Sequence, residues 1–73
     1  MTLQEIKTAI ENGQRVFRYN ESYEVIKDNK DQYFIEFIPA NQFIGLTWLD
    51  GITLNGEEEH FMTVLPSEHI NLL

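Results

Sequence analysis

The sequence predicts an α+β domain in which one N-terminal helix packs on a strongly bent antiparallel sheet of five or six strands. Three observations support this fold class. Apolar residues recur at helical spacing only near the N-terminus, β-branched and aromatic residues alternate with polar ones afterwards, and short polar breaks separate these later runs. The 73 residues suit a single domain, residues 1–73. Two other forms of the sheet stay open, a small, partly open barrel and a flat two-layer sandwich.

The helix is predicted over residues 3–12. Thr2 and Glu5 have the spacing of a capping box, and Gly13 can adopt the left-handed conformation that ends a helix. The apolar residues of this stretch fall on one face, as expected for a helix that docks on a sheet. They are Leu3, Ile6, Ala9 and Ile10.

Strands are predicted after Gly13 from runs of β-branched and aromatic residues. They cover residues 15–19, 22–27, 32–38, 43–49, 52–54 and 60–65. The polar break Asn20-Glu21 and a second break at residues 28–31 are short, so the first three strands should pair as an antiparallel meander. Pro39 and Pro66 end strands because proline lacks the amide hydrogen that a strand interior needs.

Two turn dipeptides follow the fourth predicted strand. Only three residues separate Asp50-Gly51 from Asn55-Gly56, so both cannot easily be hairpin tips. We interpret residues 52–54 as a small edge strand, with a β-bulge as the alternative. Residues 66–73 are assigned to a tail.

The third predicted strand is apolar on both faces. Tyr33, Ile35 and Phe37 share one face, whereas Phe34 and Ile38 lie on the other. A strand with two covered faces is expected in the centre of a sheet. We therefore expect the helix on one side of this strand, and folded-over strands or another subunit on the other.

Composition excludes several classes of function. The net charge is −7, from 12 acidic and 5 basic residues, and this disfavours direct nucleic-acid binding, which usually requires a basic surface. The chain has no cysteine, and therefore no disulfide, thiolate metal site or cysteine nucleophile. It has no apolar run long enough to cross a membrane and no recognisable signal peptide. We expect a cytoplasmic protein without membrane contact.

The charges are distributed unevenly along the chain. Residues 1–30 contain all five basic residues and five acidic ones, so their charges balance. From Asp31 onward the chain has seven acidic residues and no lysine or arginine. If the later strands are neighbours, one side of the domain has a negative field that attracts basic partners. The simplest alternative is that the acidic residues only keep the protein soluble. A further alternative is an acidic mimic of nucleic acid that inhibits a basic protein.

No group of residues supports catalysis. Glu57, Glu58, Glu59 and His60 have metal-binding chemistry, but in an extended strand only alternate side chains converge, and two ligands do not make a site. Ser67, Glu68 and His69 are adjacent near the chain end, which does not give the geometry of a catalytic triad. We therefore expect no enzymatic activity, no cofactor and no bound metal.

The aromatic residues are the strongest candidates for binding. Gly45 interrupts an apolar strand, which favours a bend over a contact with a ligand. Trp48 would be the first choice for a recognition hot spot if it is exposed, and Tyr19 and Tyr23 could extend such a patch. The candidate binding residues are Trp48, Tyr19, Tyr23, Asp50, Glu57, Glu58 and Glu59.

These observations favour a small, non-enzymatic protein-interaction or regulatory module that uses an acidic and aromatic sheet surface. Its partner would be a protein, with a basic one favoured by the charge. The aromatic content, with one tryptophan, three tyrosines and five phenylalanines, also favours a homo-oligomer. The alternative is a domain that binds a small ligand in a pocket near Gly45 and Trp48.

Overall fold

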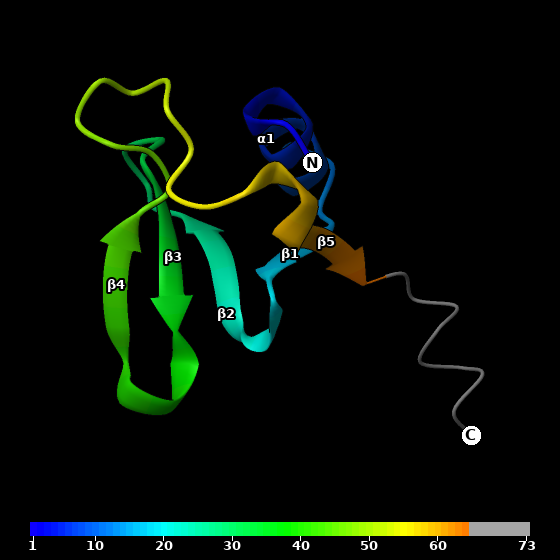
Figure 1. Ribbon diagram of the computed structural model, residues 1–73, viewed down its shortest axis with the longest axis vertical. Helices are drawn as coiled ribbons and strands as arrows, with labels where there is room; N and C mark the ends of the chain where they lie inside the picture. The colour runs from blue at the N-terminus through cyan, green and yellow to red at the C-terminus, as the bar shows by residue number, and fades with distance from the viewer. Residues whose placement is uncertain (65–73) are drawn as a thin grey trace.

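The computed structural model describes residues 1–64 (Figure 1). One α-helix and a five-stranded antiparallel sheet form the domain, so the α+β prediction is confirmed. The sheet does not close into a barrel, because its two outermost strands, β4 and β5, lie at opposite edges. The predicted tail at residues 66–73 lies outside the described residues.

Helix α1 spans Leu3–Glu11 and begins with the predicted capping box. The Glu5 amide donates to the Thr2 hydroxyl oxygen at 3.1 Å, and the Thr2 amide donates to the Glu5 carboxylate at 2.8 Å. The helix ends one residue earlier than predicted, because Asn12 is its C-cap, with ψ near 6°. Gly13 then takes a φ of 83°, a left-handed conformation that glycine adopts without strain.

The strands run antiparallel in the order β4-β3-β2-β1-β5. Their bounds are β1 Arg15–Arg18, β2 Asn20–Lys27, β3 Tyr33–Phe37, β4 Gln42–Gly45 and β5 Phe61–Val64. The register places Val16 opposite Val25, Val25 opposite Ile35, and Ile35 opposite Ile44. A row of branched apolar side chains therefore crosses four strands on the face that α1 covers in part.

The hydrophobic core lies between α1 and this face of the sheet. Ile6 and Ala9 of the helix are buried against the apolar row, together with Leu46 and Phe61 from the later part of the chain. Helix α1 contacts β1, whereas the far ends of β2, β3 and β4 extend beyond it (Figure 1). The helix therefore covers only one end of this face.

The first predicted turn is wrong in detail. Asn20 and Glu21 belong to β2, and the chain reverses at Tyr19, which has a φ of 68°. The register between β1 and β2 shifts at Arg18, as expected for a β-bulge. One residue in a left-handed conformation is enough to reverse the chain, and the Tyr19 amide is satisfied by the His60 carbonyl at 2.9 Å.

The position predicted for the third strand is also wrong. Strand β3 is next to the edge, and β2 is the central strand, because the chain returns after β4 to pair β5 with β1. Phe34 is half-buried, and its side chain lies on the opposite face of β3 from the buried Ile35. Pro39 ends the strand by starting a short 3₁₀ helix, η1, at Ile38–Ala40.

The later predicted strands differ most from the structure. Strand β4 ends at Gly45, and residues 52–54 make only one isolated bridge, between Thr47 and Leu54. The backbone leaves the sheet because the Leu46 side chain turns into the core, where it is 1% exposed. The last strand begins one residue later than predicted, because His60 is the final residue of a 3₁₀ helix, η2, at Glu58–His60.

Candidate functional site

The loop between β4 and η2 exposes three large apolar side chains. Trp48 is 60% exposed, Ile52 is 76% exposed, and Leu49 is fully exposed. We call Trp48, Leu49 and Ile52 the apolar tip. Side chains of this size rarely lie together on a loop in contact with water, because each loses the free energy of apolar burial.

Hydrogen bonds from Asp50 hold the apolar tip in shape. One carboxylate oxygen of Asp50 accepts from the Ile52 and Thr53 amides, both at 2.9 Å, and the other accepts from the Thr53 hydroxyl at 2.5 Å. The bond from the Thr53 hydroxyl is the main cause that lowers the pKa of Asp50 below its ordinary value, followed by the two amides. Asp50 therefore orders the loop from within.

The presence of glycine at position 45 is explained by the backbone geometry, without a ligand. A Cβ atom on this residue would lie 3.0 Å from the Thr47 carbonyl oxygen, so the tight exit from β4 requires glycine. This geometry is the bend that the sequence favoured. Neither Gly45 nor Trp48 belongs to the linings of the cavities described below.

A second group of side chains surrounds Arg18 at the end of β1. The Arg18 guanidinium lies 5.0 Å from the Tyr19 ring centre and 5.1 Å from the Tyr23 ring centre. The Tyr19 ring is 4.6 Å from the His60 ring, and the Tyr23 ring is 4.8 Å from the Phe37 ring. The predicted pair Tyr19 and Tyr23 is thus brought together, at 6.1 Å, around a cation.

A groove of about 300 Å³ opens beside this group. It lies on the same face of the sheet as the core, at the end that α1 leaves uncovered, and spans β1 to β4. We call it the Arg18 groove. Its lining residues are Arg18, Tyr23, Ile35, Phe37, Gln42 and Ile44.

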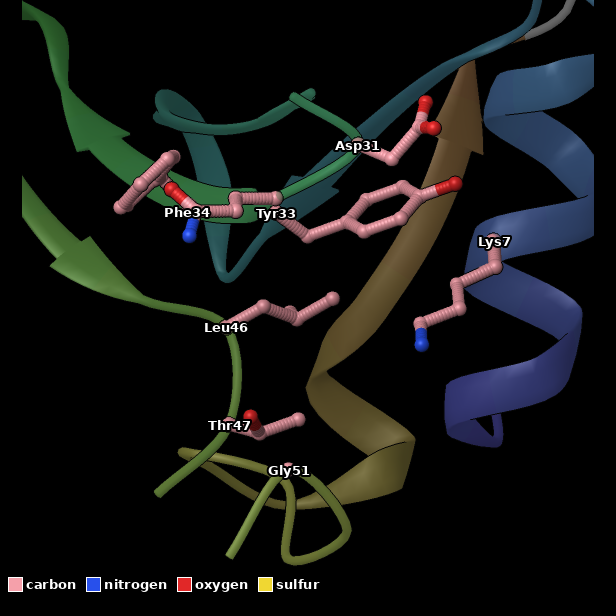
Figure 2. A pocket seen from close by; sticks show the side chains of 8 residues that line it. Lys7, Asp31, Tyr33, Phe34, Leu46, Thr47 and Gly51 are labelled. Atoms are coloured by element: carbon pink, nitrogen blue, oxygen red, sulfur yellow. The ribbon is translucent and has the colours of Figure 1, made fainter. Parts of the chain in front are cut away.

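A further cavity of about 320 Å³ lies between α1 and the loop after β4 (Figure 2). Lys7 from the helix, Tyr33 and Leu46 point into it, and the Lys7 ammonium is 5.3 Å from the Tyr33 ring centre. Asp31 at its rim pairs with Lys27 at 3.5 Å. This cavity carries one cation and one anion at its edges and has no single ligand chemistry.

Three of the acidic candidates, Glu57, Glu58 and Glu59, lie together and line one cavity with Met1. Glu57 precedes η2, Glu58 and Glu59 belong to it, and the Met1 ammonium donates to the Glu58 carbonyl. The segment Glu57 to His60 folds as a turn of 3₁₀ helix and not as an extended strand, so the alternation of side chains considered for a metal site does not apply to it. Within residues 1–64, no three histidine or carboxylate side chains are placed to hold a metal ion.

The order of the strands divides the acidic half of the chain. Strands β3 and β4 form one edge of the sheet, whereas β5 lies at the other edge beside β1. The condition for a single acidic side, that the later strands are neighbours, thus holds for β3 and β4 and not for β5. Among residues 1–64, no helix has the length and hydropathy to span a membrane.

The candidate residues predicted from the sequence included neither Leu49 nor Ile52 of the apolar tip and, of the residues that line the groove, only Tyr23. Leu49 and Ile52 flank the Asp50-Gly51 turn, and a turn dipeptide inside an apolar stretch is a signal that its neighbours lie at a loop tip. For Arg18 the sequence left open a weak anion contact but favoured a surface ion pair, and Phe37 was only placed on one strand face with Tyr33 and Ile35. Their meeting depends on the bulge at Arg18, which the sequence does not announce.

Comparisons with protein-family models, with curated proteins and with solved structures found no match for this chain.

Proposed function

We propose that this protein is a small, non-enzymatic protein-interaction module and that the apolar tip is the centre of its contact surface. The single observation that carries the proposal is the exposure of Trp48, Leu49 and Ile52 on an internally hydrogen-bonded loop. Large apolar side chains at the centre of an interface contribute most of its binding energy. The ordering of the loop before binding lowers the entropy lost on association.

The charge around the apolar tip favours a basic partner. The segment from Leu46 to Glu59 contains Asp50 and three consecutive glutamates, and no lysine or arginine. An apolar pocket with lysine or arginine at its rim would complement both the apolar tip and this charge. Binding should weaken with salt, but the apolar contact should keep part of the affinity when salt screens the charges.

The test compares two variants that each remove exposed apolar surface. Trp48→Ser with Leu49→Ser removes most of the apolar tip, whereas Ile38→Ser changes an exposed residue of η1 elsewhere on the molecule. Tagged wild-type protein and both variants are used to capture proteins from a lysate of the source organism. A captured protein is then purified, and its dissociation constant is measured by isothermal titration calorimetry.

We expect the apolar-tip variant to weaken binding by about 30-fold or more, since hot-spot residues contribute about 2 kcal/mol or more each. Ile38→Ser should change the constant less than about threefold. Amide chemical-shift changes in the wild type should centre on residues 46–54. Equal binding by both variants would refute the proposal, as would shift changes centred elsewhere. Light scattering measures the mass of the complex and so distinguishes a different protein from a second copy of this chain. A complex of two copies would mean that the apolar tip binds another copy of the chain and not a basic protein.

A further inference from the structure

We propose that the Arg18 groove binds a small organic carboxylate with an apolar body. This site is separate from the apolar tip and does not depend on the proposed function. Its floor is Ile35, which is 1% exposed, and its walls are the rings of Tyr23 and Phe37. Gln42 and Ile44 of β4 form the far rim. The groove therefore offers a cation at one end and apolar contacts along its length.

Arg18 has no counter-ion among the described residues. The ion pairs within residues 1–64 are Arg15 with Glu24 and Lys27 with Asp31. Arg18 instead donates from Nη1 to the Asn55 carbonyl at 2.9 Å, and its Nε atom is buried without a hydrogen-bond partner in residues 1–64. A half-buried arginine without a counter-ion is costly, and an anionic ligand in the groove would supply the opposite charge.

The groove is organised before any ligand arrives. The Asn55 amide donates to the Leu46 carbonyl at 2.8 Å, and its side chain donates to the Gly45 carbonyl at 3.2 Å, which fixes the carbonyl that holds Arg18. A Cβ atom at Gly56 would lie 3.3 Å from the Arg18 side chain, so glycine allows the loop to pack on it. Tyr19 and Tyr23 flank the guanidinium. A ligand would therefore meet a cation that is already positioned.

The chemistry of the groove favours a carboxylate over a phosphate. The planar guanidinium presents pairs of N–H donors that match the two oxygens of a carboxylate. One cation in a protein of net charge −7 compensates a monoanion better than a dianion. The apolar floor and walls favour a ligand with an aliphatic or aromatic body, and about 300 Å³ is at the small end of ligand sites.

Hexanoate is a suitable probe, and hexanamide is its uncharged counterpart of the same length. Each is titrated into the ¹⁵N-labelled protein, with inorganic phosphate as a third titration. We expect hexanoate to cause saturable amide shifts at Tyr23, Gln42 and Ile44. Hexanamide should bind at least about tenfold more weakly, because it lacks the charge-assisted hydrogen bonds.

Two arginine variants test whether the contact is specific. Arg18→Gln and Arg15→Gln remove the same charge from the same strand, but Arg15 pairs with Glu24 outside the groove. We expect Arg18→Gln to weaken hexanoate binding by about tenfold or more, and Arg15→Gln by less than about twofold. Ile44→Trp gives an independent test, because it fills the groove from an exposed edge position, leaves Arg18 intact and should abolish the shifts.

Three results would overturn the proposal. Hexanoate could cause no saturable shift, hexanamide could bind as well as hexanoate, or Arg15→Gln could weaken binding as much as Arg18→Gln. Tighter binding of inorganic phosphate than of hexanoate would also refute a carboxylate site. If Arg18→Gln does not fold, undiminished binding to a folded Ile44→Trp variant would still refute it. None of these results bears on the apolar tip.

Discussion

The two ends of one sheet face differ in what covers them. Val16, Val25, Ile35 and Ile44 are cross-strand neighbours in one row, and all four are branched apolar residues. At the helix-covered end Val16 is fully buried, whereas at the open end Ile44 is 45% exposed. Chemically similar side chains in one row thus have opposite surroundings.

The difference shows that coverage depends on the dimensions of the helix. A helix is about 10 Å wide, and strands lie about 4.8 Å apart, so one helix covers roughly two strands of a sheet. The five strands here are wider than α1 can cover. The uncovered end becomes the Arg18 groove. The apolar tip is exposed for a different reason, because it lies on the loop after β4, outside the sheet.

The largest expected effect is at the covered end. Ile6→Ala should lower the free energy of unfolding by about 2–4 kcal/mol, because it leaves a cavity in the core. This is a large part of the roughly 4–10 kcal/mol expected for a chain of this length. Ile44→Ala at the open end should cost less than about 1 kcal/mol, since that side chain is already half in water. Urea denaturation followed by circular dichroism measures both, and equal losses would refute the comparison.

A smaller effect is expected at the start of α1. Thr2→Ala removes one half of the capping box and should lower the free energy of unfolding by about 1 kcal/mol. The bond from the Thr2 amide lowers the pKa of Glu5 most and remains in Thr2→Ala, so loss of the Thr2 side-chain bond should raise that pKa only part of the way toward its ordinary value. Thr8→Ala, on the exposed side of α1, is the control. A loss for Thr8→Ala as large as that for Thr2→Ala would show that the capping box makes no specific contribution to the stability of α1.

Local signals in the sequence were sufficient to predict helix α1. The capping box and the spacing of Ile6 and Ala9 predicted the helix to within one residue. They act within a few residues of each other, so no tertiary information is needed. The prediction of a strand over residues 43–49 was wrong beyond Gly45, because Leu46 turns into the core under α1. The alternation of apolar and polar residues cannot reveal such a long-range contact.

The candidate sites were only partly predictable. Trp48 was identified as a candidate because tryptophan is uncommon and lies beside a turn, and its exposure is consistent with that role. The sequence placed Glu57 to Glu59 before the last predicted strand, which starts at residue 60, and the chain forms η2 there. The Arg18 groove requires residues from four strands to meet, and that depends on sheet order and on the bulge at Arg18, which one sequence does not encode locally.

A weaker effect is expected from the ion pair on the opposite face of β1 and β2. The Arg15 guanidinium donates twice to Glu24, at 3.0 and 2.9 Å, and these bonds raise the pKa of Arg15. Glu24→Gln should lower the free energy of unfolding by less than about 1 kcal/mol, because the Arg15 side chain is largely in water. The loss should shrink in high salt. A loss comparable to that of Ile6→Ala would mean that ion pairs stabilise β1 as much as the packing of α1 does.

The smallest effect on global stability is expected from acid at the apolar tip. This loop is ordered by hydrogen bonds to the Asp50 carboxylate and follows the last residue of β4, outside the sheet. The pKa of Asp50 is below its ordinary value of 3.8 in the folded protein. Its contribution to loop order is therefore present above that value and is lost as the pH falls through the lowered pKa.

We accordingly expect the amides of residues 48–53 to become mobile below about pH 3.8 while the amides of β2 stay rigid, as measured by ¹⁵N relaxation. Asp50→Asn cannot titrate, so its loop should show the same mobility at neutral and acid pH. Thr53→Val removes the hydroxyl bond that contributes most to the low pKa and should move the transition to higher pH. If the amides of β2 and of the loop became mobile together at one midpoint, the order of the loop would depend on the core. The contrast between the exposed loop and the core under α1 would then not hold.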